Sequence, residues 1–409
     1  MRVLLVSNAS PFECIKSGYA IQIRHITRMI LNRGHSVTHV AWNMHIGGGK
    51  HMTFNEVAAY PEFRDYTSDL YSRSLLDNPN VHLMFNPHID LPPEVKCSEI
   101  NEMINVTNSD HVFFIMDPHA LSFKDANKFE CRSHFWLPIH YDPIEKYTEH
   151  VLKHIDHIIP LSPSAEKLVM KQIGRSEKCI PHVIHFRTPL PDHITKEQLR
   201  DEFGIPLTKW LILTVAGNYE ITGRKSFDTT MVAFKKFLDN HPDALLWLHT
   251  QHKDTGNSAY DLFGMANDLN IPKQSLIITE TLLDETLLQK IYKVADAYIC
   301  GSRAEGFGIP QLEAQYHGLP VVATKFGAME DYCWHGICAE PAQVSYNQLQ
   351  GAWWVMPSIN NMADALEKVY NGEFTTTSEE VSKRVKSEMS FETVSMKIMD
   401  HLESSTNLS

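Results

Sequence analysis

A glycine-rich turn in the second half of the chain has the pattern of an anion site. Residues 302–314 read Ser-Arg-Ala-Glu-Gly-Phe-Gly-Ile-Pro-Gln-Leu-Glu-Ala and follow an apolar run at 297–300 that predicts a buried strand. Pro310 suits the first turn of a helix, where a missing N–H costs nothing. Gly306 and Gly308 let the backbone approach a ligand closely. Because a helix start offers unpaired N–H groups and a favourable dipole, this turn predicts a diphosphate site.

Two glutamates border this turn. Glu313 falls in the first turn of the expected helix, where a carboxylate can accept both hydroxyl hydrogens of a ribose, as in dinucleotide-binding folds. Glu305 precedes the turn and is expected nearer the sugar end of a donor. The alternative is a tight turn with two surface charges, but the strand, the proline and the run Gly-Leu-Pro-Val-Val-Ala at 318–323 favour a ligand site. The donor-binding stretch is therefore expected to comprise Glu305, Gly306, Phe307, Gly308, Ile309 and Glu313.

Two adjacent cations, Arg224 and Lys225, come after the first expected strand of the second half, at 210–215. Residues 217–226 read Gly-Asn-Tyr-Glu-Ile-Thr-Gly-Arg-Lys-Ser and lead into a helical pattern. Such a pair suits phosphate charges, and the plain alternative is a solvated Arg-Lys pair. The run does not match a P-loop, because five residues separate its glycines and Arg224 stands before the lysine.

Short strand-like runs alternate with helical patterns along the whole chain. Apolar strands joined by helices predict parallel sheets covered on both faces. The expected fold class is therefore α/β, with two doubly wound Rossmann-like domains facing each other across a cleft. The proline-rich stretch 188–191 is expected to separate an amino-terminal domain over 1–188 from a carboxyl domain over 189–389, which carries the ligand site described above. Ligands of such sheets bind outside the carboxyl ends of the strands.

If the bound diphosphate belongs to a nucleotide, its base is expected to be read by the loop that follows the strand-like run at 276–279. This loop extends over about 281–288 and includes Leu283 and Leu288. Backbone groups often do such reading, so the side chains of the loop reveal little about which base is bound.

Composition argues against several other classes. The formal charge of −12 disfavours nucleic-acid partners. The seven cysteines contain no CxxC pair and suggest no disulfide framework. No apolar stretch has the ~20 residues of a membrane helix, and the short first run lacks the length of a signal-peptide core. These observations favour a cytoplasmic protein without a transmembrane segment. No acidic pair suited to a divalent ion stands at a strand end, so neither a metal nor a cofactor is expected.

The run Glu305–Ala314, followed by Gly318–Ala323, resembles the carboxyl-domain signature of the retaining family 4 glycosyltransferases, or glycosyl transferases group 1. The resemblance covers nearly all of residues 205–372 and is looser over 1–190. It implies the GT-B fold, a nucleotide-sugar donor and retention at the anomeric carbon. It also implies that a C-terminal helix at about 390–404 packs back on the amino-terminal domain.

Three further site residues come from this resemblance. Lys225 matches a lysine that clasps the diphosphate, whereas the family's arginine position is Asn218 here, a departure that Arg224 could offset. Gly18 lies where the family has a glycine-rich loop near the donor phosphates. His140 matches a histidine that contacts the transferred sugar, although a structural histidine is the alternative.

Together these residues predict a hexosyltransferase that works without a metal. Lys225, Arg224 and the helix start at Gly308 would stabilise the departing diphosphate, while His140 and Glu305 would orient the sugar. No carboxylate is placed as a nucleophile for double displacement, which favours a front-face transfer. General likeness favours GDP-mannose over UDP-glucose as donor, and the acceptor is a glycan or another hydroxyl compound. The alternatives are another GT-B nucleotide-sugar enzyme, such as an epimerase, or a non-catalytic nucleotide-sugar-binding protein.

Overall fold

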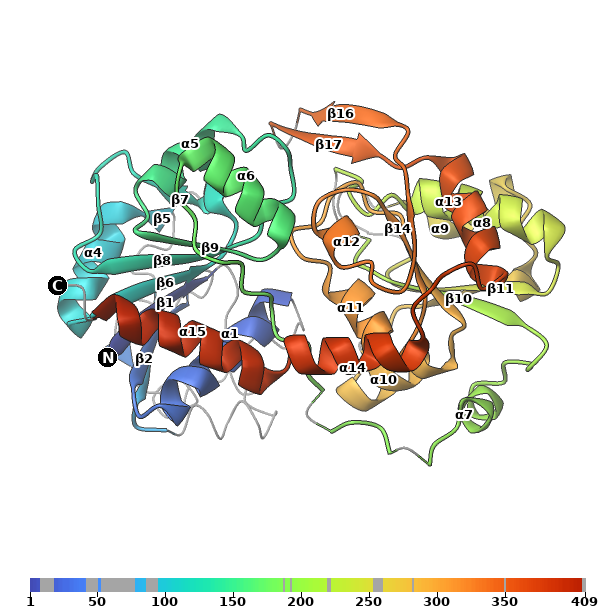
Figure 1. The fold of residues 1–409 in the computed structure, drawn as a ribbon, viewed down its shortest axis with the longest axis horizontal. Helices are drawn as coiled ribbons and strands as arrows, with labels where there is room; N and C mark the ends of the chain where they lie inside the picture. Colours follow the sequence, from blue (N-terminus) through green and yellow to red (C-terminus); the bar gives the residue numbers. More distant parts are fainter. Residues whose placement is uncertain are drawn as a thin grey trace. The chain divides into compact units, whose positions relative to one another are not determined.

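The chain folds into two compact units (Figure 1). The computed structural model describes residues 1–7, 18–41, 51–52, 78–85, 95–186, 188–191, 193–218, 222–252, 260–281, 283–348 and 351–406. Unit 1 comprises Met1–Ile139, Ile144–Val183 and Phe391–Ser409, and unit 2 comprises His140–Pro143 and Ile184–Ser390. The domain boundary predicted from the sequence, at 188–189, lies shortly after Ile184. The expected terminal helix lies in a segment assigned to unit 1.

Unit 1 is built on a seven-stranded sheet whose first strand lies in its interior. The spatial order is β3 (His51–Met52), β4 (Val81–Phe85), β2 (Ser36–Ala41), β1 (Arg2–Ser7), β6 (His111–Ile115), β8 (Arg132–Leu137) and β9 (His157–Pro160). All neighbours pair in parallel except β3 and β4. The chain thus winds from β1 to one edge and then to the other, which is the doubly wound topology.

The helices of unit 1 include one from the far end of the sequence. They are α1 (Gly18–Asn32), α4 (Cys97–Thr107), α5 (Lys146–Lys153), α6 (Pro163–Ile173) and α15 (Phe391–Thr406), with a 3-10 turn at Pro118–Ala120 and a small strand pair, β5 (Val95–Lys96) and β7 (Leu121–Ser122). Helix α15 contacts α1. Its residues Val394, Ile398 and Leu402 are fully buried, so their apolar side chains form part of the core of this unit.

Unit 2 has a six-stranded, all-parallel sheet. Its order is β12 (Leu276–Thr279), β11 (Ala244–His249), β10 (Trp210–Val215), β13 (Ala297–Cys300), β14 (Val321–Thr324) and β15 (Gly336–Ala339). Successive side chains of a strand point to opposite faces. Leu211 and Leu213 therefore belong to one hydrophobic core, and Ile212 belongs to the core on the other face.

Helices cover both faces of this second sheet. They are α7 (Lys196–Glu202), α8 (Phe227–Asn240), α9 (Leu262–Asp268), α10 (Glu285–Val294), α11 (Ile309–Tyr316), α12 (Ala328–Asp331), α13 (Ile359–Tyr370) and α14 (Ser378–Glu388), with a 3-10 turn at Lys273–Ser275. Helices α8 and α13 contribute to the core on one face, and α10 and α11 to the core on the other. A separate antiparallel hairpin, β16 (Gln343–Asn347) and β17 (Ala352–Met356), stands between β15 and α13.

Two sheets of mainly parallel strands, connected by helices, confirm the α/β class predicted from the alternating apolar runs. In unit 2 the predicted strands at 210–215, 276–279 and 297–300 coincide with β10, β12 and β13. None of the helices in the described ranges is both long and apolar enough to cross a membrane.

Candidate active site

The two chemistry-bearing segments meet at the centre of the sheet of unit 2. Strands β10 and β13 are parallel neighbours, so the loops that follow them leave from the same edge. The chain runs from β10 to β11 and β12 on one side, and then returns to build β13, β14 and β15 on the other. The edge between β10 and β13 is thus the topological switch point, where parallel sheets bind ligands. It receives the loop with Arg224 and Lys225 and the turn with Glu305.

The side chain of Glu305 is held between two cations at this point. Its Oε1 lies 2.7 Å from Lys225 Nζ and its Oε2 lies 2.8 Å from Arg224 Nη1. The hydroxyl of Ser302 donates a third hydrogen bond to Oε1, at 2.6 Å. We call these four residues the cation cluster. Because Glu305 is only 9% exposed, these interactions are little screened by solvent.

The protonation of Glu305 is determined by the cluster. Burial by itself would raise the pKa of this carboxyl group, but the charges of Lys225 and Arg224 outweigh burial and lower the pKa to about 2. Glu305 is therefore a permanent carboxylate at neutral pH. The cluster as a whole carries two positive charges and one negative charge.

Backbone hydrogen bonds fix the position of the cluster. The backbone N–H of Arg303 donates to the carbonyl of Arg224 at 2.8 Å, and Arg224 Nη1 also donates to the carbonyl of Ala304 at 2.9 Å. Ser226, at the start of α8, has a φ of 49°, a conformation that few residues other than glycine adopt. Its hydroxyl accepts a 3.2 Å hydrogen bond from Arg303 Nε. The two loops are thus tied to each other before any ligand arrives.

The glycine-rich turn begins helix α11 as the sequence predicts. Gly308 precedes the helix with a φ of +88°, which strongly favours glycine, and Pro310 lies in the first turn. Phe307 is buried, with its ring 5.0 Å from that of Tyr332, while Gly306 and Ile309 are partly buried. The burial of Phe307 fixes the turn, and the start of α11 supplies backbone N–H groups beside the cation cluster.

Glu313 lies on α11 in a different environment from Glu305. Tyr292, a buried residue of α10, donates a 2.8 Å hydrogen bond to Glu313 Oε2. Burial raises the pKa of Glu313 to about 7, because the hydrogen bond from Tyr292 offsets it only in part and the charge of Glu285 adds to the increase. The two glutamates of the motif thus differ in charge near neutrality. Glu305 is fully ionised, and Glu313 is about half protonated.

The side chain of Asn218 connects two loops of unit 2 through hydrogen bonds. Its side chain is buried and donates from Nδ2 to the carbonyls of Gln251 and Tyr260, at 2.9 and 2.8 Å. Its Oδ1 accepts from the backbone N–H of Tyr260 at 3.0 Å. The amide therefore ties together the loops after β10 and β11. Asn218 stands where the resembled family has an arginine, and its side chain is hydrogen-bonded to these two loops.

Leu283 and Leu288 belong to the hydrophobic core. Leu283 is 9% exposed and Leu288 packs against the same core as α10. Leu282, directly before Leu283, lies outside the described residues. Their side chains support the loop, so any reading of a base in this region would fall to backbone groups or to exposed neighbours such as Thr281.

Gly18 and His140 are not part of the cation cluster. Gly18 is the exposed first residue of α1 in unit 1, and the residues directly before it lie outside the described ranges. His140 is half-buried and follows β8; it is assigned to unit 2, with its ring centroid 6.2 Å from that of Trp354. Strand β8 ends at Leu137, shortly before His140.

The sequence predicted no role for two residues that form hydrogen bonds in the site. Ser302 donates to Glu305, and Tyr292 donates to Glu313. Ser302 stands within the quoted motif, so its spacing from Glu305 was the available signal. Tyr292 is 21 positions before Glu313 on another helix, and nothing in a single sequence pairs the two.

A second polar cluster lies in unit 1, and we call it the histidine network. His134 is its centre: its Nε2 lies 2.9 Å from His111 Nδ1 and its Nδ1 lies 3.0 Å from His401 Nε2. His157 stacks on His134 with an interplanar angle of 8°. Nitrogen atoms of His134, His157 and His401 lie within 4.8 Å of one another, near enough for a metal. The lone pairs of stacked, parallel rings do not converge on one point, however, so we assign the group to hydrogen bonding.

Comparison with known proteins gives a consistent result for the second half of the chain. Residues 195–388 match the family described as glycosyl transferases group 1. D-inositol 3-phosphate glycosyltransferase of Corynebacterium jeikeium (strain K411) is 31% identical over 145 residues, which cover 35% of this chain and 33% of that protein. Glycogen synthase of Bordetella bronchiseptica is 28% identical over 136 residues, which cover 33% of this chain and 25% of that protein. These matches thus span about a quarter to a third of the relatives' own length.

The fold is shared with solved structures over the full length. Sucrose-phosphate synthase from Thermosynechococcus elongatus has a TM-score of 0.71 at 13% identity, with 100% of both chains covered. The E. coli structure described as trehalose-6-phosphate bound with UDP-2-fluoro glucose has a TM-score of 0.62 at 13% identity, again with 100% of both chains covered. At such identities the likeness establishes the fold.

Proposed function

We propose that this protein transfers a hexose from a nucleotide-diphosphate sugar. The premise is that residues 195–388 belong to the glycosyl transferases group 1 and that the chain has the GT-B fold. The observation that carries the proposal is the cation cluster at the switch point of unit 2. Lys225 and Arg224 converge there on one carboxylate, beside the start of α11 and near Glu313.

The cluster suits a leaving diphosphate. Bond cleavage at the anomeric carbon moves negative charge onto the diphosphate, and fixed cations and helix N–H groups stabilise that charge. Lys225 and Arg224 are already positioned by Glu305, so little reorganisation is needed when the charge develops. We propose that Glu305 keeps these cations in place and faces the sugar, and that His140 contributes to orienting it.

The raised pKa of Glu313 supports a role in binding the nucleotide. A buried carboxylate with one hydrogen bond is poorly stabilised, and two ribose hydroxyls would supply the missing donors. We therefore place the ribose at Glu313, the diphosphate at Lys225, Arg224 and Gly308, and the hexose near Glu305. We further propose that transfer proceeds with retention and without a metal, since the cations can replace a divalent ion.

The donor is the least constrained part of the proposal. The sequence favours GDP-mannose over UDP-glucose, and the similar E. coli structure was solved with a UDP-sugar analogue. Both donors, together with ADP-glucose, therefore belong in the first test. An epimerase-like enzyme and a non-catalytic nucleotide-sugar-binding protein are the alternatives. An epimerase would release an isomerised nucleotide sugar, and a binding protein would release nothing.

The test is a melting-temperature screen of the full chain against these three nucleotide sugars, followed by product analysis. A ligand at 100 times its Kd stabilises a protein by about 2.7 kcal/mol, so one donor should raise the melting temperature clearly. With an acceptor extract present, free nucleotide diphosphate and a glycosylated product should appear. Glu313→Ala should weaken nucleotide binding about tenfold to a hundredfold, because hydrogen bonds to a charged group contribute about 1.5–3 kcal/mol. The absence of any shift with every nucleotide sugar would refute the proposal.

A further inference from the structure

The hairpin β16–β17 belongs to a long connection on the ligand-binding edge of unit 2. Residues 340–358 join β15 to α13 and include both strands of the hairpin. Strand-to-helix loops of parallel sheets usually have about two to six residues, and much longer ones are often functional. Because β15 is parallel to the other strands of its sheet, this connection leaves from the same edge as the loops that carry Lys225 and Glu305. The proposed donor site assigns it no role.

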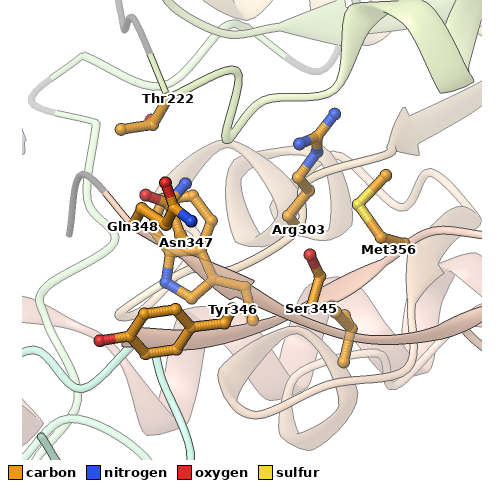
Figure 2. A pocket seen from close by; sticks show the side chains of 9 residues that line it. Thr222, Arg303, Ser345, Tyr346, Asn347, Gln348 and Met356 are labelled. Carbon is orange, nitrogen blue, oxygen red and sulfur yellow. The ribbon is translucent and has the colours of Figure 1, made fainter. Parts of the chain in front are cut away.

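A small cavity, with a volume of about 270 Å³, lies between the hairpin and the loops of the switch point. Figure 2 shows Thr222 and Arg303 of these loops together with Ser345, Asn347 and Gln348 of the hairpin. Sites that enclose a whole drug-sized ligand usually measure about 300–1,000 Å³. The cavity can therefore hold one substituent or one small ring, and it is too small for a nucleotide sugar.

The hairpin contributes neutral polar groups to the cavity. Ser345 and Asn347 are two positions apart on β16, so they project from one face of the hairpin, whereas Tyr346 projects from the other. Gln348 follows at the end of the strand and is exposed. The side chains of Ser345 and Gln348 have no hydrogen-bond partner in the described part of the chain. A hydroxyl group and an amide group are thus available as donors to a ligand.

Arg303 carries the charge of the cavity. No acidic side chain and no second cation stand among the described residues that line it. The Nε of Arg303 donates to the Ser226 hydroxyl at 3.2 Å, and Nη2 donates to Asp228 at 3.4 Å. Within the described ranges the guanidinium group has no further partner, so Nη1 keeps its N–H bonds for a ligand. The carbonyl of Arg303 accepts from Val355 of the hairpin at 3.4 Å, which ties this residue to the opposite wall.

The ion pair with Asp228 neutralises Arg303 only weakly. Its length of 3.4 Å exceeds the 2.7 and 2.8 Å that separate Glu305 from its two cations, and the Asp228 side chain is 41% exposed. Exposed ion pairs are screened by water and interact weakly. The cavity therefore combines one weakly compensated positive charge with neutral donors. A planar guanidinium group matches the paired oxygen atoms of a carboxylate or a phosphate, so this lining favours an anion over a neutral group.

We propose that the hairpin cavity binds an oxyanion of the acceptor, a carboxylate or a phosphate, which accepts hydrogen bonds from Arg303, Ser345 and Gln348. The acceptor would then be an acidic sugar or a sugar phosphate. This inference rests on the proposed function. The diphosphate of the donor has other partners in that proposal, namely Lys225 and Arg224, so the anion in the cavity belongs to the second substrate.

The experiment titrates three glycosides that differ only at carbon 6 into the full chain and measures their Kd by saturation-transfer-difference NMR. They are methyl α-D-glucopyranoside, methyl α-D-glucuronide and methyl α-D-glucopyranoside 6-phosphate. Each titration contains the nucleoside diphosphate of the identified donor at saturation, which occupies Lys225 and Arg224 without allowing transfer. We expect at least one of the two acids to bind about tenfold more tightly than the neutral glycoside, because hydrogen bonds to charged groups are the stronger ones. The preferred acid identifies the oxyanion.

Two variants assign this preference to the cavity. Arg303→Gln removes the charge and should weaken binding of the acid about tenfold while leaving the neutral glycoside unaffected. Gln348→Ala, at an exposed position, should weaken binding of the acid about twofold to threefold. Arg384→Gln is the matched control for the first variant, because Arg384 also pairs with an acid, Glu388 at 2.9 Å, but lies outside the cavity lining. Gln343→Ala is the control for the second, since Gln343 is an exposed residue of the same strand that does not line the cavity.

The outcomes separate this inference from the donor proposal. Equal affinities for the three glycosides, or binding of neither acid, would show that the inference is wrong, and the donor proposal would stand because the melting-temperature screen tests it independently. Unchanged affinity for the acid in Arg303→Gln would lead to the same conclusion. If this variant does not fold, unchanged affinity in Gln348→Ala decides instead.

The diphosphate site provides a further check. An acid that binds only without the nucleoside diphosphate occupies the site at Lys225 and Arg224, and the inference is again wrong. If the screen finds no nucleotide sugar that binds, the titrations use the free chain. Binding that depends on Arg303 would then mean that the donor proposal fails and that the cavity is an anion site without an acceptor role.

Discussion

Each unit of this protein contains a polar cluster, and the two clusters lie at opposite ends of similar sheets. In unit 2, Lys225 and Glu305 follow the carboxyl ends of β10 and β13. In unit 1, His111 and His157 are the first residues of β6 and β9, so the histidine network lies at the amino ends of the strands. Ligands of parallel sheets bind at the carboxyl ends, which favours a functional role for the first cluster and a structural role for the second.

The two clusters also differ in charge. The cation cluster is ionised, with the pKa of Glu305 held at about 2. In the histidine network, burial lowers the pKa of His111 to about 4 and lowers that of His134 well below its usual value. His111 and His134 are therefore neutral at physiological pH and interact through hydrogen bonds. The comparison indicates that a dense polar cluster in this architecture predicts a functional site only when it lies at the carboxyl ends of the strands and is also ionised.

The largest expected effect is loss of transfer in Lys225→Met. This change removes one cation but leaves Glu305 paired with Arg224 and Ser302. Losing one preorganised group that stabilises developing charge costs about 100-fold to 1,000-fold in rate. Transfer kinetics with the identified donor provide the measurement. The control is Lys290→Met, which removes an ion pair with Glu202 elsewhere in unit 2 and should keep the wild-type rate. If Lys225→Met were equally active, the functional role assigned to the cation cluster would be wrong.

The next effect is a pH dependence of nucleotide binding through Glu313. Its pKa of about 7 means that the carboxyl group is mostly protonated at pH 6 and mostly ionised at pH 8. Ribose hydroxyls donate to the ionised form, so affinity should rise about tenfold over this range. Isothermal titration at several pH values measures it. The ligand-free protein should show the opposite trend in stability, since a raised pKa means that stability is lost as pH rises through 7. Glu313→Gln should abolish both trends, and a flat wild-type profile would contradict the assignment.

The histidine network should respond in stability and leave transfer unchanged. His401→Leu leaves His134 Nδ1 without its 3.0 Å partner, which should lower the free energy of unfolding by about 1–3 kcal/mol. Ser404→Ala, an exposed position on the same helix, should change it by less than about 0.5 kcal/mol. Chemical denaturation compares the two variants. Unchanged stability in His401→Leu would show that the network does not secure α15.

Acid should weaken the same network. The histidine pKa values are lowered in the folded state, so the unfolded chain binds protons first as pH falls below about 6.5. The contribution of these histidines to stability should therefore be level above this pH and fall towards about pH 4. Asp110 raises the pKa of His111, Glu177 raises that of His401, and Arg132 opposes protonation of His111 and His134.

The smallest expected effect is that of a chelator. If Lys225 and Arg224 replace a divalent ion, excess EDTA should leave the transfer rate unchanged. Activity that disappears with EDTA and returns with magnesium or manganese would contradict the metal-free mechanism. A melting temperature that falls with EDTA would instead reopen the question of a metal at His134, His157 and His401.

Sequence alone was most informative where local pattern and burial agree. The strands of unit 2 are continuous apolar runs, and β10, β12 and β13 begin and end where those runs do. The turn at Gly308 follows from glycine and proline chemistry, which is also local. In β8 the local pattern is less informative, because the strand begins with Arg132, Ser133 and His134, and the burial of His134 depends on a partner far along the chain.

The contacts of the site could not be predicted in the same way. Arg224 and Glu305 are 81 positions apart, and no periodicity connects them. Asn218 could be recognised as a departure from the family's arginine, but its contacts with the loops at Gln251 and Tyr260 depend on the tertiary structure. The hairpin β16–β17 was missed as an element because the polar residues of β16 give it no continuous apolar run.

The position of α15 also bears on how this chain is made. Phe391–Ser409 belongs to unit 1, yet the whole of unit 2 comes before it in sequence. During synthesis, the sheet of unit 1 emerges from the ribosome long before the helix that supplies Val394, Ile398 and Leu402 to its core. Unit 2 is almost continuous in sequence and can fold while translation goes on. The nascent chain therefore carries an incomplete first unit, with exposed apolar surface of the kind that chaperones bind, until α15 has been synthesised.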